Sequence, residues 1–168
     1  MDNQARSWDK AKGKVVNILT SRPWLLPFIY HIYSLQGVKL IELKTLLGLK
    51  TAVVKRGLWW LIKSGIVEKK GEKYVISQQH TKHLAKLMLA ACTTGRRYVV
   101  KIGKVYLVAV VRKSRITAYS VPEDALNKLL NRKLENRSIK DIAAEVKMPL
   151  KLTARALKLY ETLNTCWR

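Results

Sequence analysis

The hydrophobic and polar positions at the start of the chain alternate with the period of an α-helix. Trp8, Val15 and Leu19 fall on one face of the first segment, while lysines occupy the opposite face. A second helix is predicted to begin after Ser21 and to end at Gly37, because its apolar positions keep the helical spacing and glycine commonly terminates a helix. The chain is therefore expected to open with two consecutive helices.

The segment 38–77 combines helical spacing with a later change to strand-like residues. Residues 39–47 are predicted to form a short helix that Gly48 ends, and a longer helix runs from Thr51 to Ser64. A compact two-stranded hairpin over 66–77 follows, because two short apolar runs flank a glycine-containing turn. The expected order is helix, tight turn, longer helix and hairpin.

The remainder of the chain is predicted to contain strands between helices. A helix over 78–91 comes first. Three stretches rich in β-branched and aromatic residues predict a three-stranded antiparallel meander, at 98–102, 105–111 and 115–121. Three further helices are predicted at 123–136, 139–146 and 150–163. The whole is an α+β protein, mostly helical, with expected domains at 1–92, 93–121 and 122–168.

One run within the segment 38–77 carries a resemblance to a known class of protein. It reads Leu46-Leu47-Gly48-Leu49-Lys50-Thr51-Ala52-Val53-Val54-Lys55-Arg56-Gly57-Leu58, followed by Leu61 and by Ser64-Gly65-Ile66-Val67-Glu68. These residues resemble the winged helix-turn-helix domain of MarR- and ArsR-like regulators from prokaryotes, including archaea. The resemblance implies that helix 51–64 enters the major groove of DNA and that the 66–77 wing meets its backbone. Some adaptor and ribosomal domains share the fold, so no target is implied.

The periodicity of the predicted reading helix places basic residues on its outward face. With Val54, Leu58 and Leu61 pointing inward, its first half presents lysine and arginine. The predicted nucleic-acid contacts on this helix and on the wing are Lys50, Thr51, Lys55, Arg56, Lys69, Lys70 and Lys73. Thr51 and Arg56 are expected to reach base edges, and the lysines to contact the backbone. The alternative is a solvated basic face on a domain that binds protein.

Trp59 and Trp60 depart from the family pattern, which places polar, exposed residues at these positions. We expect both to be buried under the N-terminal helix or the meander, at an interdomain or dimer contact. An exposed interaction patch is the alternative. A homodimer is expected to form through the N-terminal helix or through this Trp59/Trp60 surface.

The C-terminal segment resembles a second helix-turn-helix. Residues 138–146 match its first helix, but Lys147 takes the turn position usually held by glycine, and Thr153 stands where an aliphatic residue is usual. Lys151 and Arg155 are the candidate contacts of its second helix. The alternative to DNA binding is a structural or dimerising three-helix unit.

The charge of the chain favours a polyanionic partner. There are 33 Lys and Arg against 11 Asp and Glu, for a net charge of +22, and each phosphate that such a protein neutralises releases counterions. The segment 93–121 contains no acidic residue. Its predicted contacts are Arg96, Arg97, Lys101, Lys104, Arg112, Lys113 and Arg115. We expect the partner to be double-stranded DNA, with RNA as the alternative.

Motif and charge together predict a DNA-binding transcriptional regulator that is not an enzyme. The alternative is a structural basic protein of chromatin or the ribosome, without sequence specificity; an adaptor that uses Trp59 and Trp60 agrees less well with the charge. No cofactor or metal is expected. The sequence shows no glycine-rich phosphate loop, catalytic triad or paired carboxylates, and no cysteine or carboxylate stands at metal-ligand spacing from His80 and His83.

Cysteine content and hydropathy set the expected location. Cys92 and Cys166 are the two cysteines, no signal peptide is recognised, and the longest apolar stretches are too short to span a bilayer. We therefore expect a cytoplasmic, nucleoid-associated protein with reduced thiols and no membrane partner. A Cys92–Cys166 disulfide is the alternative.

Overall fold

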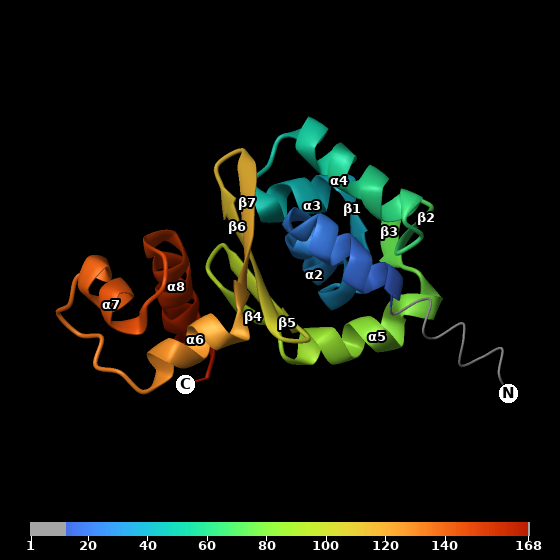
Figure 1. Cartoon of the computed structure of the whole chain (residues 1–168). Coiled ribbons are helices and arrows are strands. Elements are labelled where there is room, and N and C mark those ends of the chain that lie inside the picture. Colours follow the sequence, from blue (N-terminus) through green and yellow to red (C-terminus); the bar gives the residue numbers. More distant parts are fainter. Residues whose placement is uncertain (1–12, 168) are drawn as a thin grey trace, which may run out of the picture.

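A four-stranded antiparallel sheet stands between two helical bodies (Figure 1). The computed structural model describes residues 13–167, so Trp8 and the first part of the expected N-terminal helix lie outside the described residues. Residues 13–21 are helical, and Val15, Ile18 and Leu19 are buried as their spacing predicts. The prediction of a mostly helical α+β protein is confirmed.

The N-terminal body contains short helices and a small sheet. After residues 13–21 its elements are η1 (Pro23–Leu25), α2 (Leu26–Ser34), β1 (Val38–Lys39), α3 (Leu40–Leu47), α4 (Thr51–Lys63), β2 (Val67–Lys70), β3 (Lys73–Ile76) and α5 (Gln78–Leu89). The strand order is β1-β3-β2, and Val38 pairs with Tyr74. Strand β1 was not expected from the sequence, because two residues carry no readable alternation.

The second sheet has one strand more than the sequence indicates. Its strands are β4 (Cys92–Thr94), β5 (Arg97–Ile102), β6 (Val105–Arg112) and β7 (Arg115–Pro122), in the order β4-β5-β6-β7. The expected three-stranded meander is therefore wrong in its strand number. The missed strand β4 is three residues long and becomes a strand by pairing with β5, with Cys92 opposite Val99.

Each face of this sheet belongs to a different hydrophobic core, because successive residues of a strand point to opposite faces. Tyr98 and Val100 of β5 pack into the N-terminal core, whereas Val99 packs into the C-terminal core. Strand β6 alternates in the same way, with Leu107 on the first face and Val108 on the second. The sheet is thus part of both bodies.

The C-terminal body consists of α6 (Glu123–Leu130), α7 (Ile139–Val146) and α8 (Leu150–Cys166). Helix α6 ends well before residue 136, which corrects the predicted length. The segment after it is held to α7, because Glu145 accepts hydrogen bonds from Arg132, at 2.8 Å, and from Arg137. These bonds lower the pKa of the Glu145 carboxyl, with that from Arg137 contributing most.

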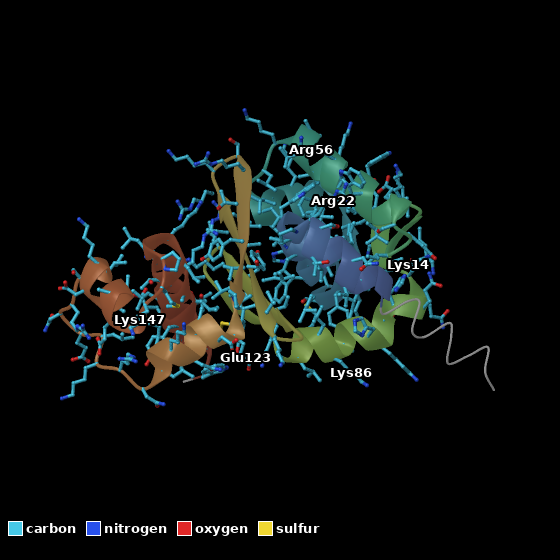
Figure 2. All side chains as sticks on the ribbon, in the orientation of Figure 1. Lys14, Arg22, Arg56, Lys86, Glu123 and Lys147 are labelled. Carbon is cyan, nitrogen blue, oxygen red and sulfur yellow. A yellow bond between two sulfur atoms is a disulfide. The ribbon has the colours of Figure 1, made fainter. Side chains whose placement is uncertain are left out.

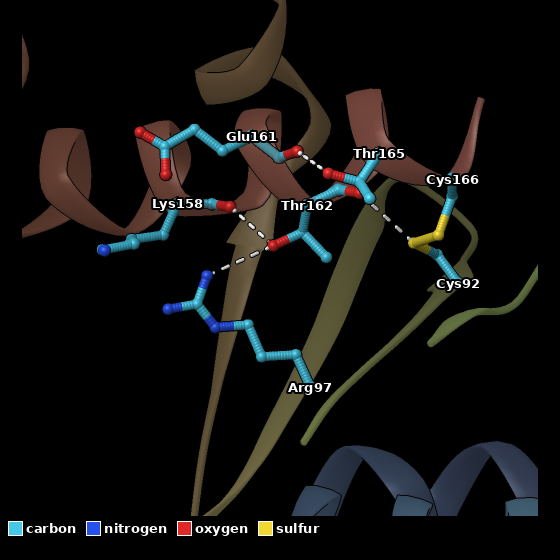
Figure 3. The surroundings of a disulfide bond; sticks show 7 residues. All are labelled: Cys92, Arg97, Lys158, Glu161, Thr162, Thr165 and Cys166. Carbon is cyan, nitrogen blue, oxygen red and sulfur yellow. Dashed lines mark hydrogen bonds between the residues drawn. A yellow bond between two sulfur atoms is a disulfide. The ribbon is translucent and has the colours of Figure 1, made fainter. Parts of the chain in front are cut away.

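A disulfide joins Cys92 at the start of the sheet to Cys166 at the end of α8 (Figure 3). The expectation of reduced thiols is therefore wrong for this pair. Arg97 lies beside it and donates to the Thr162 hydroxyl at 3.3 Å, while that hydroxyl donates to the carbonyl of Lys158 at 2.8 Å. The bond and this short network attach α8 to the sheet.

Helix α4 packs on α2 at a point where no side chain fits between them. A Cβ at Gly57 would lie 2.5 Å from Cε1 of Phe28, whose side chain is fully buried. We expect Gly57→Ala to destabilise the protein by about 1–3 kcal/mol, because overpacking outweighs the better helix propensity of alanine.

Urea unfolding of the two proteins measures this loss. Gly13→Ala is the matched control, since no atom of residues 13–167 lies within 4 Å of its Cβ position, and it should leave the unfolding midpoint unchanged or slightly raised. An unchanged midpoint for Gly57→Ala would contradict the close packing of α4 on α2. Adding Phe28→Leu to the Gly57→Ala protein should recover part of the stability that Gly57→Ala loses.

Candidate nucleic-acid interface

The position of α4 is set by the turn that precedes it. Gly48 ends α3 in the left-handed conformation, with φ 63°, and its N–H donates to the carbonyl of Lys44 at 2.9 Å. Lys50 then adopts an extended conformation, and α4 begins at Thr51. The helix buries one face of its surface against the N-terminal core and leaves the other in solvent.

The exposed face of α4 is basic in its first half and apolar in its second. The buried side chains are Val54, Leu58 and Leu61, as the spacing predicts. The exposed positions are Ala52, Lys55, Arg56, Trp59, Ile62 and Lys63. Lys50, directly before the helix, is also exposed, whereas Thr51 is half-buried. Among the described residues, no carboxylate forms an ion pair with Lys50, Lys55 or Arg56.

The β2–β3 hairpin follows α4 and carries a second group of cations. Lys69, Lys70 and Lys73 are all exposed, as expected for the wing. Glu72 at the turn pairs with Lys39 at 3.6 Å and is 85% exposed, so this pair has little effect on the charge of the three lysines. The hairpin that follows α4 therefore presents three exposed lysines at and next to its turn.

Trp59 and Trp60 have different environments. Trp59 is 52% exposed, so its expected burial is wrong, and Lys63 places its ammonium 4.6 Å from the ring centroid. Trp60 is half-buried against the N-terminal core, and the Arg22 guanidinium lies 3.5 Å from its ring centroid. An intermolecular contact through Trp59 stays a prediction.

Three of the cations expected to bind nucleic acid have hydrogen-bond or ion-pair partners within the protein. Arg96 donates to the carbonyl of Leu47 at 2.9 Å, and its guanidinium occupies the space that a side chain at Gly48 would need. Arg97 binds Thr162, and Lys101 forms an ion pair with Glu123 at 2.7 Å. Their partners are 22 to 65 positions away in sequence, so no local pattern could reveal them.

The other cations of the second sheet lie at its two ends. Arg112, Lys113 and Arg115 occupy the tip of the β6–β7 hairpin, which extends towards the N-terminal half of α4 (Figure 1). All three are exposed. Lys104 is exposed in the turn between β5 and β6, at the opposite end of the strands. The structure thus brings the β6–β7 tip, but not Lys104, towards α4.

In the C-terminal body, Lys151 and Arg155, the candidate contacts of the second predicted helix-turn-helix, have different environments. The Ser138 hydroxyl caps α7 by accepting from the Asp141 N–H at 3.1 Å, and Lys147 adopts the left-handed conformation of the turn, with φ 57°. Lys151 is exposed. The Arg155 guanidinium, however, lies 4.9 Å from the ring centroid of Tyr119 on the sheet, so this side of α8 faces the protein.

Arg22, which lies in the link between the first helix and η1, was not predicted as a site residue. A lone arginine in a linker has no pattern that marks it, and its contact with Trp60 arises only when α4 packs beside η1. The Nε2 of His31 lies 2.6 Å from the Tyr98 hydroxyl. Burial lowers the pKa of His31, which favours the neutral ring.

Comparisons with protein-family models, with curated proteins and with solved structures found no match to the chain. Within residues 13–167, no three His, Cys, Asp or Glu side chains are grouped so that they could hold a metal ion. In the same part of the chain, no helix has the length and apolar character that crossing a membrane requires. The function is therefore argued from the geometry of the basic surfaces.

Proposed function

We propose that the protein binds double-stranded DNA through a winged helix-turn-helix, as a transcriptional regulator, with α4 in the major groove. The observation that carries this proposal is the basic, exposed first half of α4, which no carboxylate of residues 13–167 neutralises, beside a hairpin with three exposed lysines. The order α3, tight turn, α4, β2, β3, with β1 paired to β3, is the order expected of a winged helix.

The dimensions of α4 suit this role. Thirteen residues give a helix about 20 Å long, which can lie in a major groove about 12 Å wide. Arg56 has the planar guanidinium that pairs with guanine, and Lys50 and Lys55 supply charges for phosphates. The lysines of the β2–β3 hairpin, which follows the helix, are placed for the neighbouring backbone.

The second half of the same face has a different proposed partner. Trp59 and Ile62, which lie three positions apart on one helical face, are 52% and 42% exposed, and a contiguous exposed apolar patch is typical of a protein contact. We infer that this part of α4 contacts a second copy of the chain at the edge of the DNA site. A homodimer would place two reading helices on two half-sites.

A second candidate function is binding to nucleic acid without sequence preference. It is favoured by the net charge of +22 and by the exposed cations at the β6–β7 tip, which could follow a backbone of any sequence. Such a protein would belong to chromatin or the ribosome.

Selection from a random duplex library with the full chain, at physiological salt, distinguishes these functions. A regulator is expected to enrich one motif, with two half-sites if it is dimeric, and to bind it about a thousandfold or more tightly than random duplex. Equal affinity for all duplexes with a steep salt dependence would favour the second candidate. Binding to structured RNA but not to any duplex would contradict the DNA proposal.

A further inference from the structure

Three arginines from distant parts of the sequence meet in one cleft beside α4. The cleft has a volume of about 570 Å³ and lies between η1, the first half of α4 and the start of β7. Its walls include Arg22, Arg56, Arg115, Trp24, Trp60 and Ser114. Figure 2 shows Arg56 at the upper end of the N-terminal body and Arg22 below it. Neither Arg22 nor the cleft is predicted by the sequence.

The positive charge in this cleft is not neutralised within the part of the chain that the structure describes. No acidic residue lines the cleft there, and none of the three guanidinium groups has an ion pair or a side-chain hydrogen bond. Cations that line one cleft repel one another, so a bound anion would stabilise them there. A group with several charged oxygens would relieve that repulsion.

The two tryptophans hold two of the arginines in place. The Arg22 guanidinium lies 3.5 Å from the centroid of the Trp60 ring, and that of Arg56 lies 5.7 Å from the centroid of Trp24. Stacking on an aromatic ring leaves the N–H groups at the edge of a guanidinium free to donate. Less side-chain entropy is then lost when an oxyanion binds, and the planar fork of arginine fits phosphate with two parallel hydrogen bonds.

We propose that this cleft is a phosphate-binding site, in which Arg22 and Arg115 donate to the oxygens of one phosphate group while Arg56, which also lines the cleft, adds its charge to the field there. The phosphate could come from two sources. One is the backbone of DNA lying on α4, since the cleft borders the exposed face that carries Lys55, and this source rests on the proposed function. The other is a free nucleotide or pyrophosphate, which would act as an effector and requires no DNA.

The first arm of the test measures duplex DNA binding to the full chain over a range of salt concentrations. Arg22→Gln and Arg115→Gln are compared with Lys86→Gln, which removes the same charge from an exposed position on α5, away from the cleft. If the DNA backbone is the source, each arginine variant should bind about tenfold more weakly. The slope of log K against log salt should become shallower in each, by at most the value of about 0.9 that one phosphate contributes, and that of Lys86→Gln should stay closer to the parent's.

The second arm measures binding of inorganic pyrophosphate to the full chain by calorimetry, without DNA. If a free phosphate is the source, the parent and Lys86→Gln bind it, and both arginine variants lose at least tenfold in affinity. This arm decides the proposal even if the protein fails to bind DNA, so its result is independent of the proposed function. If both arginine variants match Lys86→Gln in both arms, the phosphate site is refuted.

The Arg115 variant distinguishes a loss of phosphate binding from a folding defect. Arg22 stacks on the half-buried Trp60, so its replacement could disturb the packing of α4, whereas Arg115 lies exposed on the β6–β7 hairpin. Thermal unfolding followed by circular dichroism shows which variants keep the parent's stability. Loss of phosphate binding in a stable Arg115→Gln is sufficient support, and unchanged binding in it overturns the role of Arg115.

Discussion

Replacing Lys55 and Arg56 together by alanine is expected to weaken binding of the selected DNA motif about a hundredfold. Both side chains lie on the exposed face of α4, and removing a base-edge contact and a phosphate contact costs about 1–3 kcal/mol each, or about tenfold in affinity for each 1.4 kcal/mol. The loss should be larger for the motif than for random duplex, because Arg56 is proposed to read a base. Fluorescence anisotropy with both duplexes measures this difference.

The matched control is Lys86→Ala/Lys128→Ala, which removes the same charge from exposed positions on α5 and α6. It should lower the affinity for both duplexes by a similar, smaller factor, because it weakens only the long-range field of the protein. Urea unfolding should give the same midpoint for both double variants and the parent. If Lys55→Ala/Arg56→Ala lost no more affinity than the control and selected the same motif, α4 would not be the reading helix.

Removal of the disulfide is expected to have the largest effect on stability. The bond closes a loop with a sequence separation of 74, and loss of such a cross-link costs about 2–4 kcal/mol, chiefly because the unfolded chain regains its freedom. We expect the free energy of unfolding to fall by this amount when the parent protein is treated with a thiol reductant. Urea unfolding with and without reductant measures it.

Cys92→Ala/Cys166→Ser provides the internal control, because its unfolding should not respond to the reductant. Its stability should be close to that of the reduced parent. DNA affinity of the folded protein should change little in either case, since the bond joins β4 to α8 on the side of the sheet away from α4. A parent protein that unfolds at the same urea concentration in both conditions would show that the disulfide does not stabilise the fold.

Local features of the chain were sufficient to predict α3, α4 and the β2–β3 hairpin to within a residue or two. Their signals are the helical spacing of Val54, Leu58 and Leu61, the glycine that ends α3, and a glycine in the hairpin turn. Each acts between residues a few positions apart, through helix hydrogen bonds and turn geometry. The bounds of α7 were predicted for the same reason.

The elements that were mispredicted depend on partners distant in sequence. Strand β4 exists because it pairs with β5, and α6 stops early at a segment that Glu145 of α7 holds. The candidate site likewise contains residues predicted from local spacing and residues whose roles depend on distant partners. The exposed cations of α4 and of the wing could be read from periodicity, whereas the structural roles of Arg96 and Arg97 required their contacts across the fold.

The sequence by itself determined the basic first half of α4, because the side on which a residue falls depends only on the helical repeat and on the buried positions around it. Only the tertiary structure decided that Trp59 is exposed while Trp60 is half-buried, that the cysteines pair, and that Arg22, Arg56 and Arg115 share a cleft. Those outcomes depend on how η1, α4 and the β6–β7 hairpin pack together, and on the position of α8 against the sheet. Such packing sums many weak contacts between distant segments, which no local spacing records.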